Sequence, residues 1–571
     1  MPVPHLFCAE VDSIQTTLFR TSGQRQVVGG SSLLATLDQR APELARERYG
    51  VHPDDVLKHG GGSFLIVFPD RDPAVAFGQD LADLYRILLD ASITVTEPLP
   101  LPGGRDDPNF RDTQKQINSD LRSMKRENRK PVSIAHAPTT AFCQSSGTGL
   151  AETYKKPSAI SAETEQYLSQ YARVAGEAGA AVKKQNLFLD RLYDFLPEIY
   201  SDLPLAAGVD AIAALDEARG NVAYLMADAN NMGKYFGMCD AQQMIELALA
   251  LDNAISAAVT APLEKLVERL SLDEDFLPVL PLILAGDDVF LLLPAFYALD
   301  YARQFCLKFE DVMAQQPVVQ AVRQVHDELK PDEPSLPNPT LAVCVVICKG
   351  NYPYNLVHQQ GEKFLKDAKT MIKTTCAGQP TWHSAVALHL ITGGELISVN
   401  RHTSQCLSTL MPYWVKEGEA LESPFKNASL ELNRLLASRY RLRDMPQKRQ
   451  VEVEYLYTPE MLPHNLNNIQ ASKWMKSLLR LKERMTANDP ESPVEATPWE
   501  TFQSILSALG GEQKAEFTFE TGHWRDITRY NAPSKDNDLY YANGIADLLR
   551  VWPYAQELKH RLSEYQGKEE R

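Results

Sequence analysis

Three aspartates near the middle of the 571-residue chain have the type and spacing needed to hold divalent cations. Asp228 ends an apolar run, and Asp287 and Asp288 lie between two further apolar runs. Gly286 precedes the pair and permits a tight turn there. A solvated turn is the alternative interpretation. If folding brings the three carboxylates together, they offer the oxygen ligands that hard cations prefer, and they predict nucleotidyl-transfer chemistry.

The residues after Asp228 add a candidate phosphate contact. They read Ala-Asn-Asn-Met-Gly, so the strand that ends near Asp228 is expected to turn into a helix with free amide donors. We therefore expect Asn230, Asn231 and Gly233 to contact phosphate, and Gly286 to let the backbone approach a nucleotide.

Alternating periods predict the elements that position these residues. Residues 221–227, 279–284, 289–293 and 341–348 are short apolar runs bounded by turns, as is typical of central strands. Between these runs, apolar residues recur at the spacing of a helix, and helical segments dominate after about residue 395. The fold class is therefore mixed α/β (α+β). Connectors rich in proline, glycine and small polar residues indicate domain boundaries, and we predict four parts, at residues 1–100, 101–215, 216–395 and 396–571.

A pattern that occurs twice extends the argument. Residues 8–15 and 60–69 resemble residues 226–233 and 285–294. When Glu10 is aligned with Asp228, Gly62 falls on Asp287. Both copies are predicted to fold as a strand, a helical crossover and a tight hairpin, but the first has Gly62 and Ser63 where the second has acids.

With these motifs, the chain resembles the large subunit of type III CRISPR effector complexes over roughly residues 5 to 395. The most specific feature is the order of a Gly-Gly-Gly-x-Phe hairpin followed by an Ala-Gly-Asp-Asp hairpin. The resemblance implies two ferredoxin-like palm domains of the GGDEF-cyclase type at 1–100 and 216–395, a linker with a degenerate zinc module, and a helical C-terminal domain.

The resemblance also implies the activity, the joining of ATP into cyclic oligoadenylates for antiviral defence when target RNA is bound. Asp228, Asp287 and Asp288 would hold two Mg²⁺ or Mn²⁺ ions and act as the catalytic residues. Lys369 would contact phosphate. Gly61, Gly62 and Ser63 of the metal-free first copy would bind the second ATP, with Glu10 as the only acid left there.

Three departures from the family pattern qualify these expectations. Ala285 stands where the family has glycine, which requires a negative φ at that position. We expect no HD nuclease domain, and we interpret His326 and Asp327 as a solvated helix face. Only Cys143 and His136 remain near the zinc module, so we expect no structural zinc.

Composition supports an ordinary globular protein. The chain has 44% hydrophobic and 23% charged residues, which excludes disordered and fibrous classes. Neither an export signal nor a membrane span is expected, so we predict a cytoplasmic protein. The net charge of −16 excludes a general attraction to nucleic acid. We interpret the basic cluster of Lys125, Arg126, Arg129 and Lys130 as a solvated helix face rather than an RNA track.

The partners implied by the resemblance are the small subunit, the RNA-binding backbone subunits, guide RNA and target RNA. Two alternatives stay open: an inactive architectural subunit of such a complex, and a stand-alone nucleotide cyclase that needs no RNA.

Overall fold

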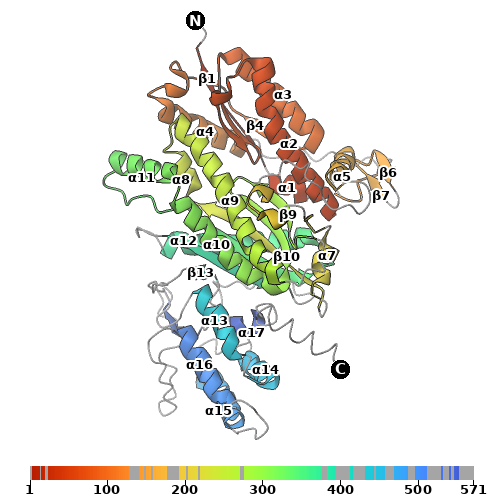
Figure 1. Ribbon diagram of the computed structural model, residues 1–571, viewed down its shortest axis with the longest axis vertical. Helices are drawn as coiled ribbons and strands as arrows, with labels where there is room; N and C mark the ends of the chain where they lie inside the picture. Colours follow the sequence, from red (N-terminus) through yellow and green to blue (C-terminus); the bar gives the residue numbers. More distant parts are fainter. Residues whose placement is uncertain are drawn as a thin grey trace.

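The computed structural model describes the chain except for residues 1–2, 13, 20–22, 128–140, 147–149, 156–157, 176–191, 201–202, 207, 217–218, 270–275, 376–381, 392–411, 416–430, 443–444, 457–467, 487–495, 511–528, 532–538, 542–544 and 552–571. The described elements lie in three tiers along the long axis (Figure 1). The first tier contains the first copy of the duplicated pattern (residues 5–127). The second contains the second copy (residues 221–390), and the third is helical.

The first copy folds as a five-stranded sheet flanked by helices. Its elements are β1 (His5–Val11), α1 (Ile14–Phe19), α2 (Gln24–Tyr49), β2 (Val56–Gly60), β3 (Ser63–Phe68), α3 (Arg71–Leu89), β4 (Ile93–Val95), β5 (Leu99–Pro100) and α4 (Phe110–Glu127). The strand order is β2-β3-β1-β4, with β5 also paired to β1. The sequence of elements from β1 to β4 is the βαββαβ pattern of ferredoxin-like folds.

The second copy repeats this arrangement. Its elements are β8 (Asn221–Asn230), α8 (Met232–Phe236), α9 (Ala241–Arg269), β9 (Leu280–Ala285), β10 (Asp288–Pro294), α10 (Ala298–Ala314), α11 (Pro317–Leu329), β11 (Thr340–Lys349), α12 (Tyr354–Thr375), β12 (Ser384–Leu390) and β13 (Tyr413–Val415). The order β9-β10-β8-β11 matches the first sheet strand for strand, and β12 and β13 extend it beyond β11. The four strands predicted from apolar runs and the α/β fold class are confirmed. β13 comes from beyond residue 395, the predicted end of this domain.

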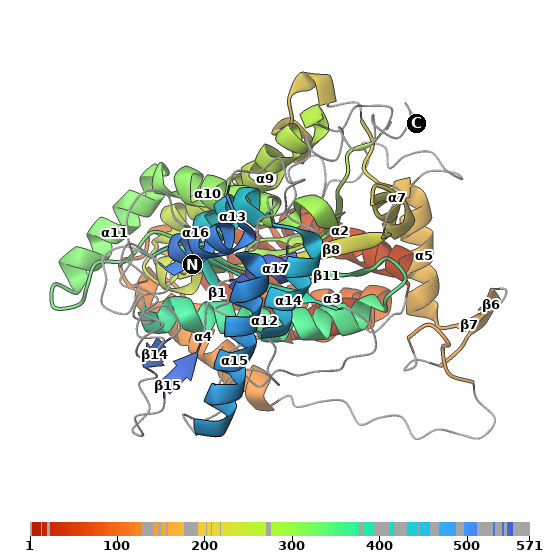
Figure 2. The ribbon, with the colours of Figure 1, turned by 90° about the horizontal axis from the view of Figure 1, so that it is seen from below.

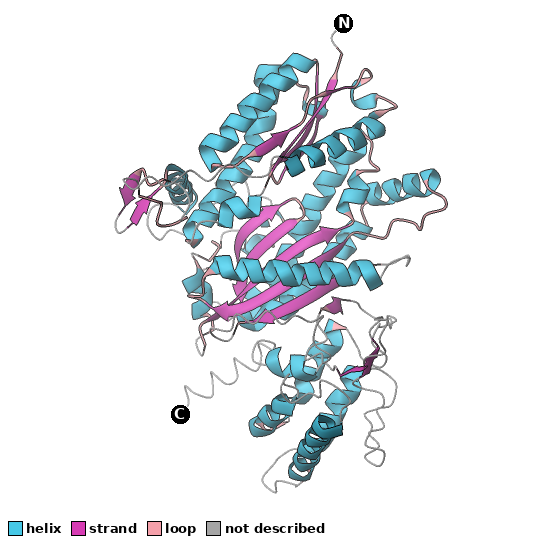
Figure 3. Cartoon of the chain, turned by 180° about the vertical axis from the view of Figure 1, so that it is seen from behind, coloured by secondary structure: helices cyan, strands magenta, loops and turns pink. Residues whose placement is uncertain are grey.

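In the central strand of each copy, the position of a residue determines which of the flanking helices its side chain contacts. Neighbouring residues of a strand point to opposite faces. In β1, Phe7 contacts Phe77 of α3, whereas Glu10 contacts Lys125 of α4. In β8, Met226 lies against Gly361 of α12, which crosses the strands in Figure 3. Helices α4 and α12 therefore cover corresponding faces of the two sheets.

Side chains of the first copy pack directly on the second. Phe19 of α1 lies edge-on to Phe290 of β10 at 5.2 Å and stacks on His358 of α12 at 4.0 Å between centroids. On α4, Gln114 donates a hydrogen bond to the Phe236 carbonyl of α8 at 2.9 Å. The two copies thus form one packed body.

The remaining elements lie outside the two sheets. A hairpin and a helix project to one side of the body in Figures 1 and 2: β6 (Thr153–Lys155), β7 (Ser158–Ile160) and α5 (Ala162–Ala175). Helix α7 (Val209–Ala214) precedes the second copy. The third tier contains α13 (Leu432–Leu442), α14 (Gln447–Leu456), α15 (Asn468–Met485), α16 (Pro498–Gly510), β14 (Arg529–Asn531), β15 (Leu539–Tyr541) and α17 (Ile545–Val551).

One helix in the described part of the chain, Ala241–Val267 within α9, is long and apolar enough to cross a bilayer. However, 61% of its most apolar stretch is buried inside the protein. Helix α9 packs on α10 and contacts β2 of the first copy, so its apolar residues form core between the copies. This burial is typical of a core helix.

Candidate active site

Asp228 and Asp288 are directly opposite each other on neighbouring strands. Asp228 lies near the end of β8, Asp288 begins β10, and the antiparallel register pairs the two residues. Side chains of such a pair leave the same face of the sheet, with Cβ atoms roughly 4.5 to 5.5 Å apart. The structure therefore brings together two of the three predicted carboxylates, and Asp287 adjoins them in the turn.

Helix α12 supplies the counter-charge. The Lys369 ammonium lies 2.8 Å from Asp228 Oδ2, and both side chains are less than a third exposed. Burial raises the pKa of Asp228, the Lys369 charge lowers it, and Asp287 raises it again. Burial, followed by the charges of Asp287 and Asp228, raises the pKa of Asp288 to about 7. These carboxylates therefore share a partly dry environment with mutual repulsion.

The hairpin between β9 and β10 is a tight turn at Gly286, as the sequence predicts. Its central residues are Gly286 and Asp287, and only Gly286 has a positive φ, of 62°. This is the pattern of a two-residue turn with glycine at its first central position. Ala285 is the last residue of β9 and pairs with Asp288 in the ladder. Because paired strand residues have negative φ, alanine in place of glycine causes no backbone strain at that position.

The predicted phosphate contacts lie in the turn from β8 to α8. Asn231 adopts the left-handed conformation, with φ of 71°, and precedes the five-residue helix. Asn230 uses its amide nitrogen to donate to Thr340 across the sheet at 3.3 Å. The Asn230 Oδ1 and Asn231 Nδ2 atoms are buried without a hydrogen-bond partner among the described residues. Gly233 has open space on its side-chain side.

The first hairpin differs from the second in a way that excludes an acid. Both of its central residues, Gly61 and Gly62, have positive φ, of 58° and 67°. A Cβ atom at position 62 would lie 2.6 Å from Val11 Cγ2 and 3.0 Å from Ile14 Cδ1. Ser63 then begins β3, paired with Glu10 as Asp288 is with Asp228. The alignment of the two copies is therefore confirmed residue by residue.

Lys125 is a residue whose role the sequence analysis missed. Its ammonium donates to Glu10 Oε1 at 2.6 Å and to the Val11 carbonyl at 2.9 Å, and its side chain is 22% exposed. The interpretation of Lys125 as part of a solvated face was wrong, because α4 turns it onto the end of β1. Glu10 and Lys125 correspond to Asp228 and Lys369 of the second copy. Arg129 and Lys130 lie outside the described residues.

Both hairpins line one cavity between the copies, of about 120 Å³. Gly60 and Gly61 face it from the first copy and Gly286 from the second. Helices α2 and α9 complete the wall, with Asp38 and Asp252 among their residues. Ligand pockets usually enclose about 300 to 1,000 Å³. This cavity is therefore large enough for only part of a nucleotide.

A second cavity, of about 600 Å³, adjoins the turn after Asp228. The described residues that line it are Lys115, Gly233, Lys234, Gly237, Met238, His326, Leu329, Lys330, Glu333, Pro334, Ser335, Leu336, Pro337 and Trp382. The Lys234 ammonium lies 6.0 Å from the centroid of the Trp382 ring. An aromatic plane beside several lysines can receive a flat base together with a phosphate.

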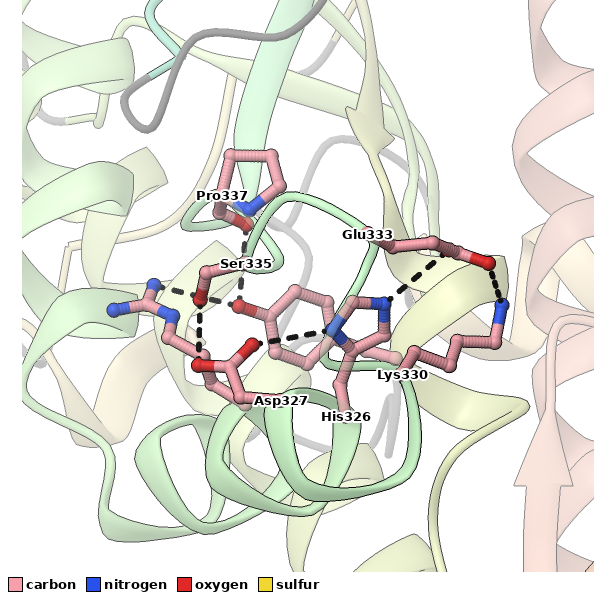
Figure 4. Close-up of polar contacts among 8 residues, drawn as sticks. His326, Asp327, Lys330, Glu333, Ser335 and Pro337 are labelled. Atoms are coloured by element: carbon pink, nitrogen blue, oxygen red, sulfur yellow. Dashed lines mark hydrogen bonds and ion pairs between the residues drawn. The ribbon is translucent and has the colours of Figure 1, made fainter.

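His326 lies at the wall of this cavity, between Asp327 and Glu333 (Figure 4). Its ring nitrogens are 3.2 Å and 3.7 Å from those carboxylates, and it is only 3% exposed. The expectation of a solvated face was wrong for this residue. His326 continues the buried stripe of Val318 and Val322 at four-residue spacing, a signal visible in the sequence.

The donor set at Asp228, Asp287 and Asp288 suits divalent cations, which prefer carboxylate oxygens. Burial is the main cause of the raised pKa values of Asp228 and Asp288, and the repulsion between carboxylates that adds to it is what a bound cation relieves. Among the described residues, however, no three acidic, histidine or cysteine side chains are arranged to hold an ion. The Lys369 ammonium instead holds Asp228. The residues fit the cations by chemistry, and their roles as ligands stay a prediction.

The buried thiol of Cys143 lies within hydrogen-bonding distance of Ser146 and Thr164. The Ser146 amide donates to its sulfur at 3.4 Å, and Thr164 Oγ1 lies at the same distance. Burial raises the pKa of the thiol, but hydrogen bonds from Ser146, Ser161 and Thr164 outweigh it and lower the pKa to about 6. His136 lies outside the described residues, and the expectation of no zinc stays a prediction.

Comparison with known families decides the identity of the second copy. Residues 221–376, which include all three aspartates and Lys369, match the family model of Cas10/Cmr2, second palm domain. The second copy is a Cas10/Cmr2 second palm domain. This confirms the resemblance predicted from the sequence. No curated protein matches the chain.

Solved structures give partial similarities. An apo Csm1–Csm4 cassette is 15% identical with a TM-score of 0.42, over 64% of this chain and 53% of that one. A Csm1–Csm4 cassette in complex with cA4 is 13% identical with a TM-score of 0.48, over 89% and 70%. Csm1 in T. onnurineus is 14% identical with a TM-score of 0.47, over the same shares. The chain spans about half the length of the first of these.

Proposed function

We propose that the protein is the large subunit of a type III CRISPR effector complex. In this role it joins ATP molecules into cyclic oligoadenylates when the complex binds target RNA. The observation that carries the proposal is the pairing of Asp228 with Asp288, within reach of Lys369, in a Cas10/Cmr2 second palm domain. A purely structural sheet has no need of two half-buried acids at one position of the ladder, because buried like charges are unfavourable.

In the proposed reaction, the 3′-hydroxyl of one ATP attacks the α-phosphate of another, and pyrophosphate leaves. Mg²⁺ or Mn²⁺ at Asp228, Asp287 and Asp288 would supply the positive charge that polarises the phosphate. Asp288 orients the attacking hydroxyl, whose proton passes to solvent. The ammonium of Lys369 moves from Asp228 to the triphosphate and offsets its charge.

Each of the two cavities receives one of the two ATP molecules. The donor ATP places its phosphates over Asn230, Asn231 and Gly233 and its base in the cavity beside Trp382. Because α8 has only five residues, individual amides provide this contact rather than the dipole of a long helix. The acceptor ATP lies against Gly61, Gly62 and Ser63. Changing Trp382 to alanine is expected to weaken ATP binding about tenfold, since stacking contributes roughly 1 to 3 kcal/mol per base.

The proposed partners are the small subunit and RNA-binding backbone subunits, with guide RNA and target RNA, in the cytoplasm. The decisive experiment incubates the purified assembly with target RNA, ATP and either Mg²⁺ or Mn²⁺ and analyses the products by mass spectrometry. Wild type is expected to form cyclic oligoadenylates, D288N to lose at least a hundredfold in rate, and the exposed-lysine control K366M to remain active. Omission of RNA or chelation of the metal should abolish the product.

A second candidate function, an architectural subunit, is favoured by one observation: Lys369 already holds Asp228. If that ion pair persists in the assembled complex, neither metal will support product formation by the wild-type assembly. Product from the isolated chain without RNA would instead identify a stand-alone cyclase. The three outcomes of the same assay therefore separate the three functions.

A further inference from the structure

The first hairpin is held from behind by a buried carboxylate. Asp38 lies on α2 and is 5% exposed. The Gly62 amide donates to both of its carboxylate oxygens, each at 3.1 Å. The Tyr85 hydroxyl of α3 donates to the Oδ1 atom at 2.9 Å. Asp38 therefore links the turn of the hairpin to the two helices that flank it.

This link acts where the hairpin has little other restraint on its shape. Gly60, Gly61 and Gly62 are three successive glycines, all with positive φ. Glycine has access to more backbone conformations than any other residue, so a run of three does not select one conformation. The bonds from the Gly62 amide to a fixed acceptor select the observed turn.

The turn forms part of the wall of the cavity between the two copies. Asp38, Gly60 and Gly61 line the same 120 Å³ cavity as Gly286 of the catalytic hairpin. Asp252 and Ser256 of α9 form part of the opposite wall. A shift of the first hairpin would therefore change the space in which the acceptor nucleotide is proposed to lie.

We propose that Asp38 is a positioning residue that fixes the metal-free hairpin against the catalytic hairpin and so sets the affinity for the acceptor nucleotide. The proposal rests on the proposed function of the two hairpins. Asp38 acts through the amide of Gly62. The ligand is the acceptor ATP, or the growing oligoadenylate that takes its place.

Burial of Asp38 adds a dependence on pH. Burial raises its pKa to about 7, although the bonds from Gly62 and Tyr85 lower it. The titratable groups that face it are Tyr85 on α3, Asp252 on α9 and, across the cavity wall, His59 on β2. The ionised form accepts the Gly62 bond more strongly than the neutral form. The hairpin is therefore held more firmly as pH rises through about 7.

Glu310 offers a matched control. It is also buried and has a pKa raised by burial to about 7, and it accepts a bond from the Ser384 amide at 2.7 Å. Glu310 lies on α10 and bonds to the first residue of β12, and neither element is part of either hairpin. The variants D38N and E310Q each remove one buried carboxylate and leave a side chain of nearly the same shape, so a general effect of losing such a group appears in both.

The test uses the full chain for hydrogen exchange and the assembled complex for kinetics. Amide exchange of residues 60–64 is expected to be at least tenfold faster in D38N than in wild type, and unchanged in E310Q. In the complex, D38N should raise the KM for ATP about threefold to tenfold with a smaller change in kcat. The KM of the wild type for ATP should fall as pH rises through about 7, and this fall should be smaller in D38N than in E310Q.

Equal exchange of residues 60–64 in D38N and E310Q would overturn the proposal, as would faster exchange with an unchanged KM. If the wild-type complex makes no product, the proposed function fails by that result alone. The positioning claim then falls with it, while the exchange measurement still shows whether Asp38 holds the hairpin.

Discussion

The difference between the two hairpins predicts different costs for the same substitution. Gly62 and Gly286 both lie in two-residue turns with φ near 65°, at 67° and 62°. Alanine in this left-handed region costs roughly 1 to 2 kcal/mol. At Gly286 nothing lies within 4 Å of the added methyl group, so G286A should cost only this amount.

At Gly62 the methyl group would also enter the core of the first copy. Val11 Cγ2 would lie 2.6 Å away and Ile14 Cδ1 3.0 Å away, so these side chains must shift. Overpacking of this kind adds roughly 1 to 3 kcal/mol. G62A should therefore destabilise the first copy by about 2 to 5 kcal/mol.

Hydrogen exchange measured by mass spectrometry can show how much each substitution destabilises the sheet that contains it. Because every 1.4 kcal/mol is about a tenfold change, amides of β1 and β3 should exchange about 30-fold faster or more in G62A. Amides of β8 and β10 should exchange about 5-fold to 30-fold faster in G286A. The same peptides of the unaltered copy serve as the internal control. If the two substitutions accelerate their own sheets equally, the steric account of the metal-free hairpin is wrong.

Two further predictions concern buried charge. K369M removes the ammonium that pairs with Asp228 and should lower the free energy of unfolding by about 1 to 2 kcal/mol, measured by urea unfolding. The control is K366M. The Lys366 side chain is exposed, so its replacement should change that free energy by less than about 0.5 kcal/mol. Glu310 has a folded pKa of about 7 against 4.5 unfolded, so its contribution to stability is fully present below pH 4.5 and is lost as pH rises through 7. Asp38 and Asp288 also have raised pKa values, so the test is the difference between the two proteins. Over that window E310Q, which keeps an acceptor for Ser384, should lose up to about 3 kcal/mol less than the wild type; parallel pH profiles for the two proteins would contradict this reasoning.

Much of the framework could be predicted because it follows from local pattern. The strands around Asp228 and Asp288 are continuous apolar runs, and the turn between β9 and β10 has a glycine where positive φ is needed. Aligning the two copies on Glu10 and Asp228 was also enough to match Ser63 with Asp288, because Ser63 pairs with Glu10 in the first sheet as Asp288 pairs with Asp228 in the second. Each of these steps uses residues close together in sequence or repeated at a similar distance.

The residues that were misread depend on packing between distant elements. Lys125 lies 115 positions after Glu10, and no local pattern indicates that α4 returns to the end of β1. His326 was judged by its charged neighbours, whereas its spacing from Val322 places it on the buried side of α11. Asp38 received no attention because a single acid in a helix carries no motif. Its importance comes from the hairpin amide that the fold brings to it.

The carboxylate and lysine pairs explain how two similar sheets differ in chemistry. Both copies keep an acid at the end of the central strand and a lysine on the covering helix, Glu10 with Lys125 and Asp228 with Lys369. In the second copy Asp287 and Asp288 lie beside that pair, and burial together with the charges of Asp287 and Asp228 raises the pKa of Asp288 to about 7. In the first copy Lys125 pairs with Glu10, and a Cβ atom at position 62 would lie too close to Val11 and Ile14 for an acid to be accommodated in the present turn. An acid at position 62 would thus require a hairpin of a different shape, and not merely a different side chain.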